Sequence, residues 1–313
     1  MVSRVSEKLG NRRVTGLEQY YTPKHLAQSL TEVLFSLLDT PRERQFLEPA
    51  GGTGSFIEAL EALGATSITS MDTHPKHPKV MQGDFLGFQS SSSGLVTISN
   101  PPFGRNNALS IPFFNHAANI STHIAFLVPR SWRKWSVQNR LDLRFHLLHD
   151  QDVNLIYEDQ AGEPLAKANE LRTCFQIWER KDVLRKKTLV PDNGFVRKTS
   201  PTEADVAMRV FGYGCGQVLE SFERKPNTTL MFLSLEGPVT ASLLRDLDFE
   251  RFRNNTAYTQ ALSFQEINYL LNEKLLGDGL AKKLSCKYCE RLLRRPDSEP
   301  KEPRIQGSAS QAK

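Results

Sequence analysis

Apolar residues recur along the first 180 positions at two spacings, which together predict helices that alternate with strands. Leucines at helical spacing follow Thr22 and Pro23; we expect Thr22 to cap this helix and Pro23 to occupy its first position. Short apolar runs predict strands at residues 45–48, 67–71, 95–99, 124–128, 153–157 and 173–178. Further helices are expected at residues 56–63, 111–118 and 140–148. This alternation indicates a mostly parallel sheet that is covered by helices on both faces.

The pattern changes near Lys186, and a less regular mixture of strands and helices follows it. Ser263 and Glu266 have the spacing of a capping box in front of an amphipathic helix. Residues 297–313 are rich in Pro, Ser, Glu and Lys, a composition typical of disorder. We therefore predict a large N-terminal domain at residues 1–185, a small C-terminal domain at 186–280 and a basic, disordered tail at 281–313.

Composition places the chain among globular proteins, with 39% hydrophobic and 24% charged residues in 313 positions. No apolar run approaches the roughly 18 residues that a membrane span requires. Residues 1–13 are polar and lack the apolar core of a signal peptide. We expect a cytoplasmic protein with no membrane partner.

The basic charge is concentrated near the C-terminus. Residues 281–295 hold six basic residues and one acidic residue, so this segment alone accounts for the net charge of +5. Such a tail suits a polyanionic partner such as nucleic acid, although a solvated terminus would have the same composition.

A glycine-rich loop, Glu48-Pro49-Ala50-Gly51-Gly52-Thr53-Gly54, follows the first predicted strand and precedes a helix. Glycines allow sharp turns and close approach to a ligand, and ligands bind at the carboxyl ends of parallel strands. The dinucleotide fingerprint G-x-G-x-x-G is absent, which disfavours a dehydrogenase. Asp72 ends the next predicted strand, where a carboxylate can accept hydrogen bonds from ribose hydroxyls. A glycine turn without a ligand is the alternative.

The most specific motif is Asn100-Pro101-Pro102-Phe103, after the strand predicted at 95–99. Two prolines fix the backbone and remove two donors, so neighbouring carbonyls remain available to accept. The Asn100 amide and a main-chain carbonyl can together accept both hydrogens of an exocyclic amine, whose lone pair is otherwise delocalised into its ring. Phe103 can stack on the base that carries this amine. An ordinary Asn-Pro turn is the alternative.

These motifs, in the order Tyr21-Thr22-Pro23, 48–56, Asp72, Asp84-Phe85 and 100–103, resemble the SAM-dependent adenine-specific (N-6) DNA methyltransferases of restriction–modification systems and phages. The resemblance covers about residues 18–180. It implies a Rossmann-like SAM-methyltransferase fold with a mostly parallel seven-stranded sheet flanked by helices. It also implies methyl transfer from S-adenosylmethionine (SAM) to the exocyclic amine of adenine in DNA, after the base is flipped out of the duplex. The C-terminal region is short for a target-recognition domain.

The resemblance implies nine cofactor-binding residues: Tyr21, Thr22, Glu48, Ala50, Gly51, Gly54, Asp72, Asp84 and Phe85. The first two would close the methionine end of SAM, and the alanine and glycines would line its backbone channel. Glu48 would hold the SAM amino group, Asp72 the ribose, Asp84 the adenine amine and Phe85 the adenine ring. The catalytic set implied is Asn100, Pro101, Pro102 and Phe103.

Basic and aromatic residues alternate after the strand predicted at 124–128: Arg130, Trp132, Arg133, Lys134 and Trp135. This mixture suits a phosphate backbone and stacked bases, so we expect it to contact nucleic acid, DNA rather than RNA. The alternative is a surface segment whose tryptophans pack on the core.

No metal is expected. Cys286 and Cys289 form a lone C-x-x-C, whereas a zinc site requires four ligands. Three other functions remain open: RNA methylation, protein-glutamine methylation with the same motif, and non-catalytic nucleic-acid binding.

Overall fold

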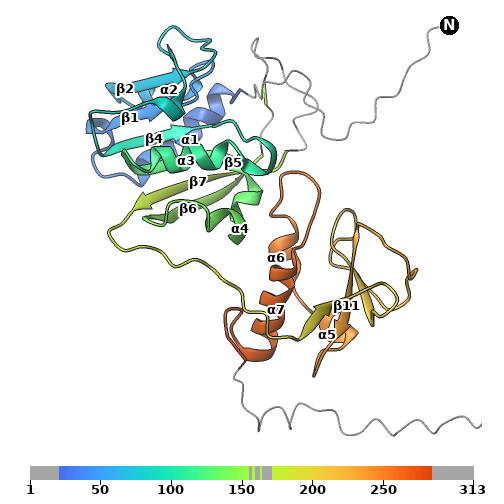
Figure 1. The fold of residues 1–313 in the computed structure, drawn as a ribbon. Helices are drawn as coiled ribbons and strands as arrows, with labels where there is room; N and C mark the ends of the chain where they lie inside the picture. Colours follow the sequence, from blue (N-terminus) through green and yellow to red (C-terminus); the bar gives the residue numbers. More distant parts are fainter. Residues whose placement is uncertain (1–20, 155–156, 159–162, 164–170, 284–313) are drawn as a thin grey trace, which may run out of the picture. The chain divides into compact units, whose positions relative to one another are not determined.

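The computed structural model describes residues 21–154, 157–158, 163 and 171–283, which fall into two compact units (Figure 1). The first unit comprises the described residues of Met1–Leu189 and Glu250–Ala261, and the second comprises those of Val190–Phe249 and Leu262–Lys313. Residues 250–261, which lie within the predicted C-terminal domain, thus group with the first unit. The predicted basic tail lies outside the described residues, apart from positions 281–283.

None of the helices in the described ranges has the length and apolar character that crossing a membrane would require.

The first unit contains one large sheet and the helices around it. Its strands are β1 Gln45–Glu48, β2 Ser67–Asp72, β3 Met81–Gln82, β4 Leu95–Ser99, β5 Ser121–Pro129, β6 Phe145–Val153 and β7 Thr173–Arg180. Its α-helices are α1 Lys24–Ser36, α2 Ser55–Ala62, α3 Ser110–Ala117, α4 Trp135–Gln138 and α6 Glu250–Arg253. Its 3-10 helices are η1 Pro41–Glu43, η2 Phe85–Gly87, η3 Arg105–Asn107 and η4 Arg130–Arg133.

The seven strands lie in the order β3-β2-β1-β4-β5-β7-β6. Neighbours from β3 to β5 run parallel, whereas β7 runs antiparallel to both β5 and β6. The chain order reverses direction at β1 and β4, and in open α/β sheets the crevice beyond the carboxyl ends of such strands is where ligands bind. The predicted fold class, a mostly parallel seven-stranded Rossmann-like sheet flanked by helices, is confirmed.

Buried side chains alternate along the central strands and form two core clusters, one on each face of the sheet. The cluster with α1 and α2 contains the strand residues Phe46, Val96, Ile98, Ala125, Leu127, Phe175 and Ile177. The cluster with α3 contains Leu47, Leu95, Ile124, Phe126, Val128, Cys174 and Trp178. Burial of both faces explains why these strands read as continuous apolar runs in the sequence.

Two predicted elements are wrong. Residues 145–148 belong to strand β6 and not to a helix, because β6 pairs with β7 from Phe145 onward, and residues 141–144 form the bend and turn before it. The strand predicted at 153–157 is also wrong, because β6 ends at Val153 and neither Asn154 nor Tyr157 belongs to a strand; residues 155–156 lie outside the described residues.

Thr22 does not cap α1. The N-cap residue is Pro23, and no side chain supplies a capping hydrogen bond there. The Thr22 hydroxyl instead has a partner in the candidate site.

The second unit contains a four-stranded antiparallel sheet in the order β10-β9-β11-β8. Its strands are β8 Val196–Lys198, β9 Val206–Arg209, β10 Val218–Leu219 and β11 Leu230–Leu235, and its helices are α5 Ala241–Arg245 and α7 Phe264–Leu276. The capping box predicted for Ser263 and Glu266 is confirmed at the start of α7.

Candidate functional site

Glu48 and Ser99 end the neighbouring parallel strands β1 and β4, so their side chains meet at the carboxyl edge of the sheet. The Ser99 hydroxyl and the Ala50 amide both donate to Oε1 of Glu48, at 2.5 and 3.0 Å. The Glu48 side chain is buried, and its Oε2 has no hydrogen-bond partner among the described residues. A buried carboxylate with one unsatisfied oxygen is a favourable binding site for a cationic group.

The surroundings of Glu48 raise its pKa from an ordinary value of 4.5 to about 8. Burial is the largest cause, because it disfavours the charged form, and the nearby Asp72 carboxylate acts in the same direction. The hydrogen bonds from Ser99 and Ala50 oppose this rise. A ligand cation at Oε2 would lower the pKa again.

The glycine loop is closely enclosed by protein groups. At Gly51 a Cβ atom would lie 2.2 Å from the Ser70 hydroxyl, and at Gly54 it would lie 2.5 Å from the His77 ring. Gly54 also has a φ of +83°, in the left-handed region that favours glycine. These glycines are therefore required for the loop to fit under its neighbours.

Asp72 ties the end of β2 to this loop. Its Oδ2 accepts from the Gly52 amide at 3.0 Å, and its Oδ1 accepts from the His74 amide at 2.8 Å. The Tyr21 ring lies against Gly52, where a Cβ would approach it to 2.9 Å. The same Cβ would lie 3.9 Å from Oδ2 of Asp72, so Tyr21 and Asp72 both lie against Gly52. Burial, followed by the Asp72 charge, raises the pKa of the Tyr21 hydroxyl.

Asn100 follows Ser99 directly and contacts the N-terminal motif. Its Nδ2 donates to the buried Thr22 hydroxyl at 3.2 Å. This bond turns the amide nitrogen toward Thr22 and leaves the amide oxygen on the opposite side. The oxygen is the atom that a substrate amine requires as an acceptor.

The remainder of the Asn100–Phe103 motif is well packed. Pro101 is buried and Pro102 partly exposed, and Phe103 has 7% of its surface exposed within the α1–α2 core cluster. The Phe103 ring therefore presents little of its face to a base in this conformation.

Asp84 and Phe85 lie in two different environments. Asp84 is exposed, and its Oδ1 accepts from the Leu86 amide at 3.0 Å, which caps η2. Phe85 is 1% exposed and contacts Phe113 and His116, with ring centroids 5.2 and 4.8 Å away. Phe85 thus packs in the α3 core cluster.

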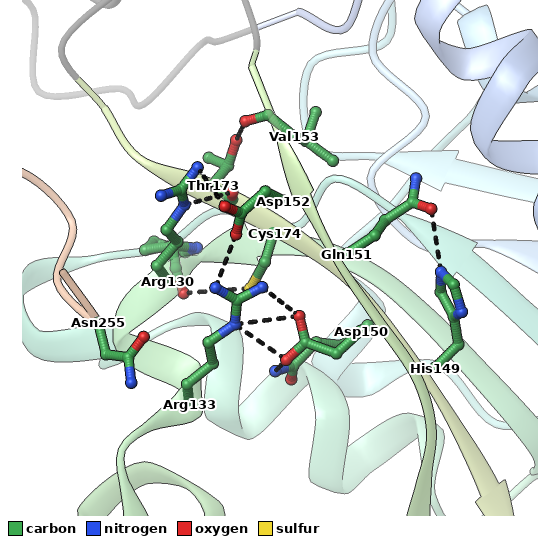
Figure 2. A network of polar contacts seen from close by, with 12 residues as sticks. Arg130, Arg133, His149, Asp150, Gln151, Asp152, Val153, Thr173, Cys174 and Asn255 are labelled. Carbon is green, nitrogen blue, oxygen red and sulfur yellow. Dashed lines mark hydrogen bonds and ion pairs between the residues drawn. The ribbon is translucent and has the colours of Figure 1, made fainter. Parts of the chain in front are cut away.

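Arg130 and Arg133 form a charge network with Asp150 and Asp152 of β6 (Figure 2). Arg133 donates through Nε to both Asp150 oxygens at 3.0 Å and through Nη1 to Asp152 at 2.7 Å. Arg130 pairs with Asp152 at 3.0 Å. Burial, the largest single cause, acts to lower the pKa of Arg133, but its interactions with Asp150, Cys174 and Asp152 together outweigh this and hold the pKa above its ordinary value. Two carboxylates therefore balance the two guanidinium groups.

The tryptophans of this segment differ in their environment. Trp132 has no exposed surface, packs in the α3 core cluster and donates from Nε1 to the Ser110 hydroxyl at 3.3 Å. The expectation that Trp132 contacts nucleic acid is thereby corrected in favour of the core alternative. Trp135 is partly exposed and lies 5.4 Å from the Phe252 ring, and Lys134 is also partly exposed.

Two residues of this site, Ser99 and His77, are not among those predicted from the sequence. Ser99 supports the Glu48 carboxylate, and a small hydroxyl residue at a strand end beside the Asn100 motif could have indicated this role. His77 covers Gly54 and lies 3.9 Å from Glu58, although its proline-flanked segment has the pattern of an exposed loop.

No group of three or more His, Cys, Asp or Glu side chains in the described part of the chain could hold a metal ion. Cys286 and Cys289 lie outside the described residues.

No protein-family model matches the sequence, and neither does any curated protein. Among solved structures, the putative RNA methyltransferase PH1948 from Pyrococcus horikoshii is 23% identical, with 53% of this chain and 88% of that chain covered and a TM-score of 0.43. The modification subunit of a putative type I restriction enzyme from Vibrio vulnificus YJ016 is 16% identical, with 52% and 44% covered and a TM-score of 0.38. TrmN from Thermus thermophilus is 16% identical, with 50% and 48% covered and a TM-score of 0.37. Each likeness spans about half of this chain. We therefore infer the function of this chain from its own residues.

Proposed function

We propose that this chain is a SAM-dependent methyltransferase that methylates the exocyclic amino group of adenine in DNA. The observation that carries this proposal is the adjacency of two motifs at the ends of β1 and β4. Ser99 bonds to Glu48 of the glycine loop, and the next residue, Asn100, bonds to Thr22. A cofactor held by Glu48 would therefore lie beside an amide suited to binding an amine.

The residues at the loop fit SAM. The unsatisfied Oε2 of buried Glu48 would accept from the cationic amino group of the SAM methionine moiety. Each oxygen of Asp72 accepts one backbone bond and retains a lone pair for the ribose hydroxyls. Tyr21 and Thr22 would close the methionine end, and Asp84 would lie toward the adenine of SAM. Phe85 is packed in the α3 core cluster, so it would contact the adenine ring only after a change in its packing.

When bound, SAM supplies a methyl group that is already activated by its cationic sulfur, so the protein contributes mainly positioning and electrostatics. The Asn100 amide oxygen and the Pro101 carbonyl would accept the two hydrogens of the target amine. Holding both hydrogens favours a tetrahedral nitrogen whose lone pair is available for attack. The nitrogen becomes acidic once it has been methylated, so it can release its proton without a strong base.

A base inside a duplex could not reach this site and would have to be flipped out. Stacking on Phe103 would require the ring to rotate or its loop to move, because the ring is packed in the core cluster. The following residues could permit this movement: Gly104, Asn106 and Asn107 all have positive φ, and the two asparagines are strained there.

Incubation with tritiated SAM and separate DNA, RNA and protein substrates tests the proposal. The expected result is labelled N6-methyladenine in DNA digests. Label in RNA alone or on protein glutamine would replace the substrate assignment. An absence of SAM binding in calorimetry would overturn the proposal as a whole.

A further inference from the structure

The second unit exposes two aromatic side chains on the turn between β9 and β10. We call residues 211–217 (Phe-Gly-Tyr-Gly-Cys-Gly-Gln) the aromatic turn. The Tyr213 side chain is 100% exposed and Phe211 is 49% exposed. A single exposed aromatic residue is common on a protein surface. Whether Tyr213 is suited to bind a ligand therefore depends on how the turn holds it.

The backbone conformation of the aromatic turn is held by three glycines and by hydrogen bonds within the turn. Gly212, Gly214 and Gly216 have φ values of 85°, 76° and 101°, which favour glycine at each position. The Cys215 amide bonds to the Gly212 carbonyl at 3.1 Å, and the Gln217 amide bonds to the Gly214 carbonyl at 3.0 Å. These bonds fix the backbone on both sides of Tyr213.

The base of the turn is anchored in the second unit. Arg209 and Gln217 pair across it with a backbone bond of 2.8 Å, and Val210 bonds to the Thr229 carbonyl at 2.9 Å. The Cys215 side chain is buried, and a Cβ atom on Gly216 would lie 3.2 Å from Phe249. The fold therefore presents the Tyr213 ring to solvent on a rigid support, which lowers the entropy lost when the ring binds a ligand.

A cation lies beside Gly214, the residue after Tyr213. The Arg209 side chain packs against Gly214: a Cβ atom on Gly214 would lie 3.3 Å from Cδ of Arg209. Its guanidinium forms no ion pair with any carboxylate of the described residues. The carboxylate of Glu220, on the residue after β10, is paired with Arg245. Arg209 thus differs from Arg130 and Arg133 of the first unit, whose charges are balanced.

We propose that the aromatic turn is a nucleic-acid contact, in which Tyr213 stacks on an unpaired base and Arg209 binds an adjacent phosphate. An exposed aromatic ring on a hydrogen-bonded turn, with an unbalanced cation at the neighbouring Gly214, matches the base and phosphate of one nucleotide unit. The ring offers no hydrogen-bond pattern for a particular base, so the contact is tolerant of sequence. The inference rests on the proposed function, since it assigns the second unit a role toward the same substrate.

Binding of labelled single-stranded DNA, single-stranded RNA and duplex DNA to the full chain tests this inference, with fluorescence anisotropy as the readout. Tyr213→Ala should raise the Kd for single strands about 5- to 150-fold, whereas Tyr213→Phe should stay within about twofold because it retains the ring. Arg209→Gln should reduce the log–log salt slope by about 0.7 on a single strand. Tyr258→Ala, which removes a partly exposed tyrosine of the first unit, is the matched control and should bind like the wild type.

Wild-type affinity in Tyr213→Ala would overturn the inference, and so would equal losses in Tyr213→Ala and Tyr213→Phe. An absence of nucleic-acid binding by the wild type would also overturn it and would favour a protein partner for the turn. Calorimetric SAM binding by the same variants separates the two proposals. If the wild type binds SAM and nucleic acid but Tyr213→Ala loses neither, only the inference about the turn fails.

Discussion

The Ser99 hydroxyl donates a 2.5 Å hydrogen bond to Oε1 of Glu48, which joins the carboxyl ends of two neighbouring parallel strands. One residue further along, Asn100 bonds to Thr22, which precedes α1. The proposed cofactor and substrate positions therefore share a continuous set of hydrogen bonds, and changes at one should be measurable at the other.

Glu48→Gln should remove a pH dependence of stability. The Glu48 carboxyl holds its proton up to a pKa of about 8 in the native state, compared with an ordinary 4.5. The native state thus binds more protons than the unfolded chain in this window. The free energy of unfolding should fall as pH rises from about 5 to 8, by at most about 1.4 kcal/mol per pH unit. Urea unfolding of both proteins at several pH values measures this; parallel pH profiles would contradict the assignment.

Thr22→Val should lower kcat about 2- to 10-fold, because a hydrogen bond that orients Asn100 is worth roughly 0.5–1.5 kcal/mol. Thr31→Val is the matched control: Thr31 is a buried threonine of α1 whose hydroxyl bonds to the Ala27 carbonyl. If both variants lose the same activity, the Thr22 effect reflects stability and not the orientation of Asn100.

Sequence patterns predicted most of the first unit, because its strands are buried on both faces and its motifs lie at strand ends. The order of pairing, the reversed strand β7 and the two-residue strand β3 had no local signal. Thr22 shows the limit most clearly. Its position before Pro23 is that of a helix cap, yet its hydroxyl accepts from Asn100, which is 78 residues away. Local spacing cannot reveal such a long-range partner.

The same limit applies to Arg130 and Arg133. As a sequence they form a basic segment, but the carboxylates that balance them come from β6, which was partly interpreted as a helix. Tyr213 is the converse case, since exposure on a glycine-rich turn is visible only in the folded chain.

Arg133→Ala should destabilise the first unit by about 2–4 kcal/mol, because it leaves Asp150 partly buried with its main cationic partner removed. It should not alter the salt slope of nucleic-acid binding, since its charge is already balanced. Thermal unfolding and salt titration measure the two effects. A slope reduced by about 0.7–0.9 would instead identify Arg133 as a phosphate contact.

Phe103→Ala should lower the free energy of unfolding by about 3–5 kcal/mol, because the ring is packed in the α1–α2 core cluster. Phe103→Leu should restore most of this stability but not the affinity for a flipped base. Chemical denaturation and binding of DNA with an abasic partner opposite the target adenine measure the two properties. Full base affinity in Phe103→Leu would exclude stacking as its role.

The most direct test of the central claim is single-turnover methylation of adenine-containing DNA by Asn100→Ala, with SAM affinity measured on the same protein. Asn100 would contact the substrate amine in the transition state, so its loss should reduce the rate about 100- to 1000-fold while SAM binds as it does to the wild type. Methylation by Asn100→Ala at the wild-type rate would contradict the claim that this amide activates the adenine amine.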